Sequence, residues 1–285
     1  ENVIVDTTSG TPTLELETGS TDRKAIFDSY SSSYYHYFSY TVQAGDTSSD
    51  LDYTSTSALS LNGGTFKDAA GNNANLTLPA PGAYNSLGAN NALSIDSIVP
   101  TVAITSNVST LAKGETATLT FTVSEPITWQ GITVSGGTLG ELSSSFWTTY
   151  TATFTPTDDS TANGVISVAN SGLSDSAGNT NTDGSDANNT VTLSVDTTTP
   201  TIIGVSSSTA NGSYKVGDSI TINVAFTEAV TVDTTNGTPT LELETGSTDR
   251  TATYASGSGT NTLAFTYTVQ SGDTSSDLDF KSTSA

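Results

Sequence analysis

The stretch Thr116-Ala-Thr-Leu-Thr-Phe-Thr-Val123 alternates threonine with an apolar residue over eight positions. Successive side chains of a β-strand point to opposite faces of its sheet. This alternation therefore predicts a strand whose Ala, Leu, Phe and Val side chains face a core, while its threonines face water.

The same pattern recurs along the chain. Comparable alternation occurs at 101–106, 150–154, 190–195, 219–226 and 240–244, and Asn-Gly pairs that favour tight turns stand at 62–63, 163–164, 211–212 and 236–237. We find no window with helical periodicity. Short strands at this spacing, in modules of roughly 100 residues, predict an all-β fold of tandem immunoglobulin-like β-sandwiches arranged end to end.

An internal repeat organises the chain. Residues 1–58 align with 228–285 without a gap, at an offset of 227, and about 40 of the 58 positions are identical. The segment Thr-Pro-Thr-Leu-Glu-Leu-Glu-Thr-Gly-Ser-Thr-Asp-Arg occurs at both 11–23 and 238–250. The chain therefore contains two copies of one module, called A here, on either side of a different module, called B.

We predict three modules from this pattern. They are 1–97 (type A, truncated at its N-terminal side), 98–199 (type B, complete) and 200–285 (type A, truncated at its C-terminal side). The joints are Ser94-Ile-Asp-Ser-Ile-Val-Pro-Thr101 and Ser194-Val-Asp-Thr-Thr-Thr-Pro-Thr201, where proline favours an extended residue before it. This arrangement is expected of a segment taken from a longer tandem array of modules.

Composition restricts the function. Lys+Arg number 7 against 29 Asp+Glu, giving a net charge of −22. A surface of this sign repels nucleic acid and anionic membranes and attracts cations. Cysteine is absent, so neither disulfides nor thiol chemistry is available. The single histidine, His36, has no recognisable catalytic partners, and we do not expect an enzyme.

Topology predicts a metal site at the first joint. A first strand at 101–106 and a returning strand at 116–123 would bring Glu125 back beside Asp96, and the loop before the last strand would bring Asp175 and Asn179 to the same end. Converging carboxylates in a Gly/Asn-rich setting suit Ca²⁺, which takes six to eight oxygen ligands. Zn²⁺ fits less well without cysteine.

Each A module contains some of the residues expected for a site of the same kind. Their candidate ligands are Glu1 and Asp68 in the first copy, then Asp196 at the second joint and Glu228 in the second copy. The alternative for each Asp-x-Ala-Gly-Asn loop is a tight turn in which the side chains bond the backbone. The acids Asp46, Asp50 and Asp52 form another cluster, for which a calcium loop and a solvated turn remain alternatives.

The two A copies differ most in one hairpin. Where the second copy has a Gly/Ser-rich turn, the first has Tyr30, Tyr34, Tyr35, His36 and Tyr37. Tyr-rich loops make adaptable contacts with sugars and proteins. The hairpin is therefore a candidate contact patch, and neutral variation in a tolerant loop is the alternative.

The joint motifs, the Ser-Glu-Pro or Thr-Glu-Ala after the second strand, and Asp-x-Ala-Gly-Asn together resemble the bacterial Ig-like tandem repeats of large secreted, biofilm-associated and RTX-type adhesins. The resemblance implies extracellular or cell-surface modules, with Ca²⁺ stiffening the joints. At the first joint the chain departs from that pattern, because Ser97-Ile98-Val99 replaces Thr-Thr-Thr.

Two functions follow. One is a calcium-stiffened stalk segment of an adhesin, whose neighbours are further Ig-like repeats. The other is a building block of a self-assembling filament or surface layer, with lateral contacts through the Tyr-rich hairpin and missing strands supplied by another chain. A glycan or host-surface ligand is a further possible partner, and neither nucleic acid binding nor membrane insertion is expected.

Overall fold

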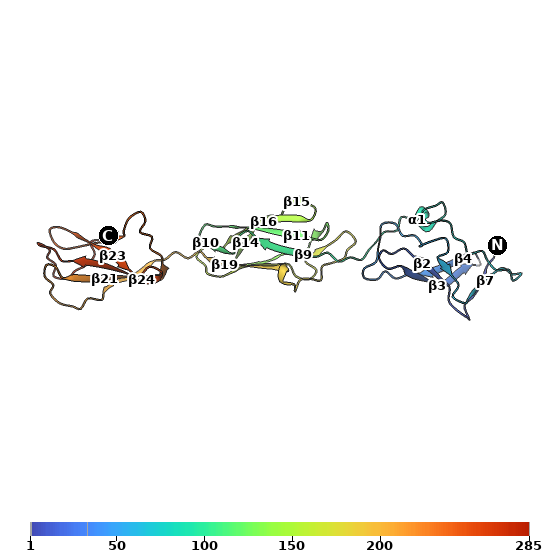
Figure 1. Cartoon of the computed structure of the whole chain (residues 1–285), viewed down its shortest axis with the longest axis horizontal. Coiled ribbons are helices and arrows are strands. Elements are labelled where there is room, and N and C mark those ends of the chain that lie inside the picture. Colours follow the sequence, from blue (N-terminus) through green and yellow to red (C-terminus); the bar gives the residue numbers. More distant parts are fainter. Residues whose placement is uncertain (1, 33, 285) are drawn as a thin grey trace. The chain divides into compact units, whose positions relative to one another are not determined.

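The computed structural model describes residues 2–32 and 34–284, and the side chains of these except at 30–32. The described chain is nearly all β-structure, which confirms the predicted fold class (Figure 1). The strand predicted at 116–123 is β11 (Ala117–Val123), with the expected alternation of buried and exposed positions. By contact density the chain divides into two compact units, Glu1–Asp196 and Thr197–Ala285.

The first A copy, in the first unit, is built around a sheet of order β4-β3-β2-β6, with the separate pairs β1-β7 and β5-β8. Its elements are β1 (Ile4–Asp6), β2 (Thr13–Leu16), β3 (Arg23–Ser32), β4 (Tyr35–Ser39), β5 (Thr47–Ser48), β6 (Leu59–Ser60), β7 (Thr65–Lys67), α1 (Leu87–Asn90) and β8 (Ile95–Asp96). The helix α1 is one turn whose N-terminus is capped by Ser86, too short to show periodicity in the sequence.

The B module, also in the first unit, is a two-sheet sandwich. One sheet has the order β10-β19-β17-β13 and the other β14-β16-β11-β9, with β15 also pairing β16 and a small pair β12-β18. The strands are β9 (Val102–Ser106), β10 (Thr110–Ala112), β11, β12 (Thr128–Trp129), β13 (Thr133–Ser135), β14 (Gly137–Leu139), β15 (Ser143–Phe146), β16 (Thr149–Pro156), β17 (Gly164–Ser167), β18 (Leu173–Ser174) and β19 (Thr190–Asp196), with a 3-10 turn η1 (Ala187–Asn189).

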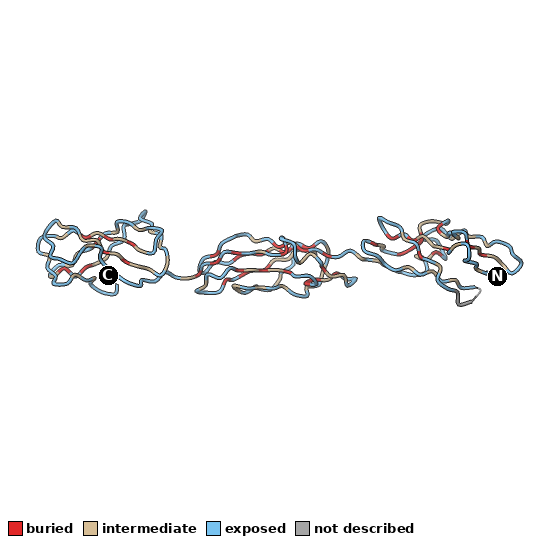
Figure 2. Tube along the Cα trace, turned by 90° about the horizontal axis from the view of Figure 1, so that it is seen from below, coloured by how far each residue is buried: buried red, intermediate tan, exposed pale blue. Residues whose placement is uncertain are grey.

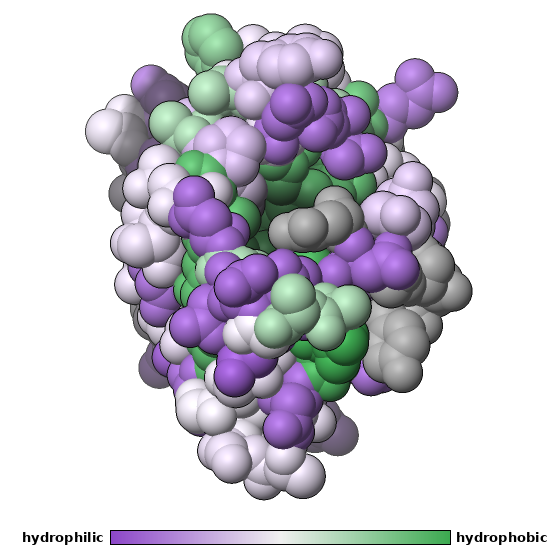
Figure 3. All heavy atoms as spheres, turned by 90° about the vertical axis from the view of Figure 1, so that its right-hand side faces the viewer, coloured by the Kyte–Doolittle hydropathy of each residue, from purple (hydrophilic) through white to green (hydrophobic). Residues whose placement is uncertain are grey.

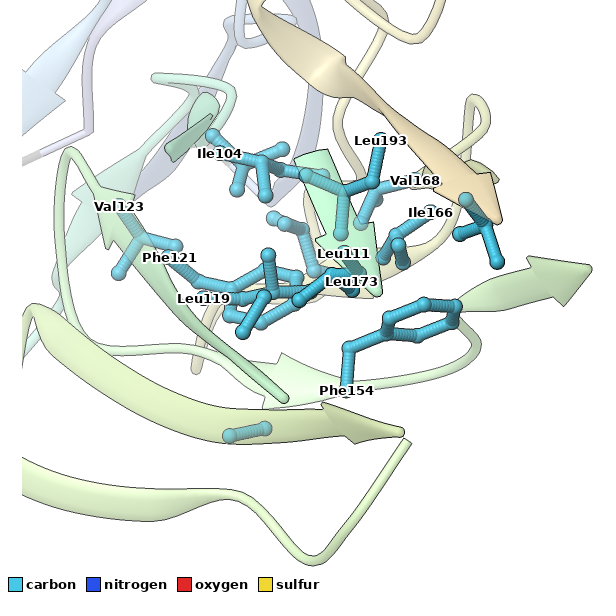
Figure 4. Packing of buried hydrophobic residues seen from close by; sticks show 14 residues of the cluster. Ile104, Leu111, Leu119, Phe121, Val123, Phe154, Ile166, Val168, Leu173 and Leu193 are labelled. Atoms are coloured by element: carbon cyan, nitrogen blue, oxygen red, sulfur yellow. The ribbon is translucent and has the colours of Figure 1, made fainter. Parts of the chain in front are cut away.

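The B core forms where the inner faces of these sheets meet. Leu119, Phe121 and Phe154 are fully buried, and in Figure 4 they lie with Ile166 and Leu193 in one continuous cluster. Burying an aliphatic or aromatic side chain of this size contributes about 1.5–3 kcal/mol. The alternating apolar positions of the sequence therefore supply the packing that holds the two sheets together.

The second unit contains a sheet of order β20-β21-β24-β23-β22. Its strands are β20 (Ile202–Ser207), β21 (Ser219–Val230), β22 (Thr240–Leu243), β23 (Arg250–Ser256) and β24 (Thr260–Thr268). The offset of 227 makes β22, β23 and β24 the counterparts of β2, β3 and β4. In the second unit β24 pairs β21, whereas β4 ends its sheet among the described strands.

Buried residues gather in clusters that the joints separate (Figure 2). One cluster lies within 14–95, one within 102–195 and one within 220–278. Each falls inside one predicted module. The division at 97 and 199 itself stays a prediction, and the contact-based boundary between the two units lies at Asp196 and Thr197.

Candidate metal centre

Strand pairing brings Glu125 back to the entrance of the B module. In the antiparallel pair of β9 and β11, Val102 lies opposite Val123. Ser124 extends this pairing, because its N–H donates to the Thr101 carbonyl at 3.1 Å and its Oγ accepts from the Thr101 N–H at 2.9 Å. The residue after Ser124 therefore stands beside the chain that enters from Asp96.

A tight turn delivers Asp175 to the same end. Asp175 follows β18, whose Ser174 lies opposite Thr128 of β12. The Asp175 carboxylate accepts from the Asn179 N–H at 2.8 Å and from its side-chain Nδ2 at 2.7 Å, and Gly178 has a positive φ of 94°. These bonds hold the Asp175 carboxylate in place on the loop without the help of a cation.

Asp96, Glu125 and Asp175 meet in one cluster. Each offers a carboxylate oxygen, and the three oxygens lie within 4.8 Å of one another. Asp96 is exposed, Glu125 half-buried and Asp175 buried. Asn179, also predicted as a ligand, acts here as a donor, since its Nδ2 bonds the Asp96 carbonyl at 3.0 Å as well as Asp175.

Electrostatics distinguish the three acids. Burial raises the pKa of Glu125, and the negative charges of Asp96 and Asp175 raise it further. Burial also pushes the pKa of Asp175 upward, but hydrogen bonds from Asn179 and the neighbouring backbone outweigh it and leave the pKa lowered. Like charges this close repel one another, and a divalent cation with a preference for oxygen ligands would neutralise them.

An open hollow of about 890 Å³ adjoins the cluster. Asp96 and Glu125 line it, and so does Glu17, which the sequence argument did not single out. Glu17 follows β2 in the repeated Leu-Glu-Leu-Glu segment. Its spacing of two residues from Glu15 is the feature of the sequence that could have identified it as a candidate ligand. Carboxylates from both sides of the joint thus face one space.

The four A-copy ligands remain predictions. Asp68 closes the same turn as Asp175, accepting from the Asn72 N–H at 2.8 Å and from Asn72 Nδ2 at 2.7 Å. Glu1 lies outside the described residues. Asp196 ends the first unit and Glu228 belongs to the second, where its Oε2 accepts from Thr198 Oγ1 at 3.0 Å.

Of the acids at 46–52, Asp46 and Asp52 are buried and bonded within the fold, whereas Asp50 is exposed. Asp46, 1% exposed, accepts from Arg23 Nε at 2.8 Å, from the Gln43 N–H at 2.9 Å and from the Tyr40 hydroxyl. Asp52 is buried and accepts backbone N–H donors from Tyr53 and Gly82, both at 2.9 Å. These carboxylates hold the fold together.

The Tyr-rich hairpin is divided between two faces. Tyr34 and Tyr35 are each 67% exposed and Tyr37 is 49% exposed. His36 points to the other face of β4, where its ring centroid lies 5.4 Å from that of Phe66, so packing explains it better than contact with a partner. The Tyr30 side chain lies outside what the structure describes.

The surface near the start of the chain is mixed. Seen from that side, hydrophilic side chains surround a smaller area where hydrophobic ones come to the surface (Figure 3). Among the described residues, no helix is long and apolar enough to cross a membrane.

Comparison with known proteins finds a similar family for the middle of the chain. The family described as bacterial Ig-like domain matches residues 96–192, which include Asp96, Glu125 and Asp175. We found no match among curated proteins and none among solved structures. Residues 96–192 are thus similar to a bacterial Ig-like domain, a structural or adhesive module that is typically extracellular and generally not enzymatic.

Proposed function

We propose that the chain is an extracellular segment of a large bacterial surface adhesin, a stalk of tandem Ig-like repeats whose joints are stiffened by Ca²⁺. The internal repeat, the Ig-like match at 96–192 and the acidic surface support this proposal. Its neighbours are then further Ig-like repeats, and its place is the cell surface.

The cluster of Asp96, Glu125 and Asp175 carries the proposal. Asp96 ends the first A copy, while Glu125 and Asp175 belong to loops of the B module. A cation held by all three would tie the exit of one module to the entrance of the next. It would also remove the repulsion that raises the pKa of Glu125. Side-chain and backbone oxygens nearby, and water, would complete the shell of six to eight ligands.

The first test is small-angle scattering and thermal melting of the full chain with Ca²⁺ or with a chelator. We expect Ca²⁺ to raise the melting temperature of the first unit and to narrow the distribution of interatomic distances. Glu125→Gln should abolish most of this response, because it removes one of the three carboxylates. Glu141→Gln is the matched control, since it makes the same charge change at an exposed position outside the cluster.

The variant also has a distinctive behaviour without the cation. The folded pKa of Glu125 is raised, so its ionisation costs stability as the pH rises through that pKa. In chelator at neutral pH, Glu125→Gln should therefore melt at the same or a higher temperature than the natural chain. An equal Ca²⁺ response in both Gln variants, or none in the natural chain, contradicts the proposed site.

A second function is favoured by the tyrosines of the hairpin. Tyr35 and Tyr37 are exposed on β4 and Tyr34 on the turn before it, where another chain could pack. The chain would then be a building block of a filament or surface layer, and a glycan is the other ligand that such tyrosines suit.

A further inference from the structure

The B module has an uncharged outer face on the sheet that contains β9, β11 and β16. In β11 the apolar residues are buried, so Thr118, Thr120 and Thr122 point to the opposite face, and β16 alternates in the same manner. Within the described residues of this module, charged side chains lie in loops or at the end of a strand. The first A copy differs, since Glu15 of β2 lies opposite Lys24 of β3.

The threonines of this face form rows across the strands. Thr122 lies opposite Thr149, which lies opposite Phe146 of β15, and Thr120 lies opposite Thr151 in the next row. Side chains directly opposite each other share a face, with Cβ atoms about 4.5–5.5 Å apart, and successive rows are about 7 Å apart. The result is a regular grid of hydroxyl and methyl groups. We call it the threonine face, formed by Thr118, Thr120, Thr122, Thr149, Thr151 and Thr153.

Two exposed aromatic rings stand at one corner of the threonine face. Phe146 is 74% exposed and Trp147 is 80% exposed. Trp147 and Thr148 form the two-residue turn between β15 and β16 at the edge of the sheet (Figure 1). Turns of this length favour asparagine and glycine, so the turn itself does not require tryptophan. Single exposed apolar residues are common, whereas two large adjacent rings surrounded by polar groups indicate a contact surface.

Hydrogen bonds hold the backbone of this turn while both rings stay exposed. The Thr148 carbonyl accepts from the Val123 N–H at 3.0 Å, which ties the turn to the end of β11. The Trp147 carbonyl accepts from the Tyr150 hydroxyl at 3.3 Å. A surface whose backbone is already ordered loses little conformational entropy when it binds a partner.

Charge and polarity limit what the threonine face can bind. Nucleic acid and anionic lipid require lysine and arginine, which the described residues of this face lack. An apolar partner would bury the threonine hydroxyls without hydrogen bonds. Two copies of the chain, each with a net charge of −22, repel each other. A neutral sugar chain avoids these costs, because it is uncharged and carries both hydroxyl and C–H groups.

We propose that the threonine face, with Phe146 and Trp147, is a binding surface for a neutral polysaccharide. The two rings stack on the C–H faces of sugar units, whose partial positive charge is attracted to the negative face of an aromatic ring. The threonine hydroxyls both donate to and accept from sugar hydroxyls. Binding of this kind requires no calcium, and all of its residues lie in one module.

The test is affinity gel electrophoresis of the full chain in chelator, with dextran, mannan or amylose cast into the gel. We expect one or more of these neutral polysaccharides to retard the chain, and alginate, which is acidic, to leave its migration unchanged. Trp147→Ala and Phe146→Ala should each weaken binding roughly tenfold, as expected for the loss of one stacked ring. Tyr84→Ala is the matched control, because it removes a ring that is 87% exposed in another module.

Threonine variants test the face separately from the rings. Thr122→Val keeps the shape of the side chain and removes one hydroxyl, so it should weaken binding roughly three- to tenfold, the effect of one hydrogen bond. Thr192→Val is the matched control, since Thr192 is exposed on β19 of the other sheet. Circular dichroism should show that all of these variants remain folded, because the substituted side chains are exposed.

Four results would overturn the proposal. The first is migration that none of the three neutral polysaccharides changes, and the second is equal retardation by alginate. The third is binding that persists unchanged in Trp147→Ala and Phe146→Ala. The fourth is a concentration-dependent association of the chain, measured by sedimentation velocity, that these two variants abolish, because the corner would then be a contact between copies. Since chelator is present throughout, these outcomes are independent of the calcium site.

Discussion

At the scale of single residues, the two A copies share a partly buried trio, whose aspartate the sequence left open between a calcium loop and a solvated turn. Tyr267 and Arg250 both bond the carboxylate of Asp273, the Arg250 Nε at 2.9 Å, and Tyr40 and Arg23 do the same for Asp46. Hydrogen bonding to Tyr267 lowers the pKa of Asp273, with Arg250 adding to the effect against the cost of burial. An ion pair of this kind matters because removing one partner leaves a buried group unsatisfied.

The tyrosines of these trios should lose their protons only at high pH. Burial, then the hydrogen bond to the neighbouring carboxylate, raises the pKa of Tyr40 and Tyr267 to about 12. Since the folded pKa lies above the unfolded value, this stability is complete below about pH 10 and is lost as the pH rises through about 12. Ultraviolet titration of tyrosinate should show a late phase near pH 12, accompanied by loss of the strand signal in circular dichroism.

The control for this titration is another pair of tyrosines. The variant Tyr40→Phe with Tyr267→Phe should lack the late phase. The variant Tyr34→Phe with Tyr84→Phe removes two exposed rings, 67% and 87% accessible, and should keep it. If the natural chain completed its titration well below pH 12 while still folded, the trios would not be as close as the structure has them.

The trios also show which contacts could be predicted from the sequence and which could not. The hairpin between 24 and 39 differs in most positions between the copies, yet Tyr40, Arg23 and Asp46 are kept in both. The presence of the same three residues in both copies indicates that they interact. The sequence does not show, however, which of several acids the arginine contacts. The convergence at Asp96, by contrast, follows from counting strands, because each antiparallel strand returns the chain to a known end.

At the scale of elements, alternation predicted strands and missed what joins them. The pattern at 116–123 is strong because every second side chain is buried in the same core. Strand β10 has three residues and pairs β19 in parallel, and three residues hold too little pattern to predict a partner. The turn α1 is likewise fixed by the Ser86 cap and by contacts with distant residues.

The loop that carries Asp175 is held by buried amides. Asn181 is fully buried, and its Nδ2 donates to the Ala169 carbonyl at 3.0 Å and to Asp183 at 2.9 Å. Asp183 in turn accepts from the Val102 N–H at 3.0 Å, which ties the loop to the first strand of the module. This network positions the acid cluster, and nothing in the local sequence distinguished these residues from a solvated turn.

Replacing one of these amides should therefore destabilise the whole B module. Asn181→Ala should lower the free energy of unfolding by about 1–3 kcal/mol for each buried group it leaves unpaired. Denaturant unfolding followed by tryptophan fluorescence can measure this, because Trp129 packs against Phe121 with ring centroids 5.6 Å apart. Asn188→Ala, at an exposed position of the same loop, should change stability little. Equal stabilities of the two variants would show that the network does not support the loop.

At the scale of the whole molecule, stalk and filament make different demands on the same chain. A stalk needs each module to be closed and each joint to be stiff, and its contacts run along the chain. A filament needs contacts between chains, for which the first copy offers the exposed side chains of Tyr34, Tyr35 and Tyr37. The two are separated by how association depends on protein concentration and on Ca²⁺.

Sedimentation velocity over a wide concentration range decides between them. If the filament function holds, the natural chain should associate as its concentration rises, and replacing Tyr34, Tyr35 and Tyr37 by serine should reduce that association at least tenfold. Tyr84→Ser is the matched control, because Tyr84 is 87% exposed outside the hairpin. If the chain instead remains monomeric at every concentration while Ca²⁺ changes its melting, the tyrosines have no role in assembly, and the acid cluster at the joint is left as the feature that sets the mechanics of the chain.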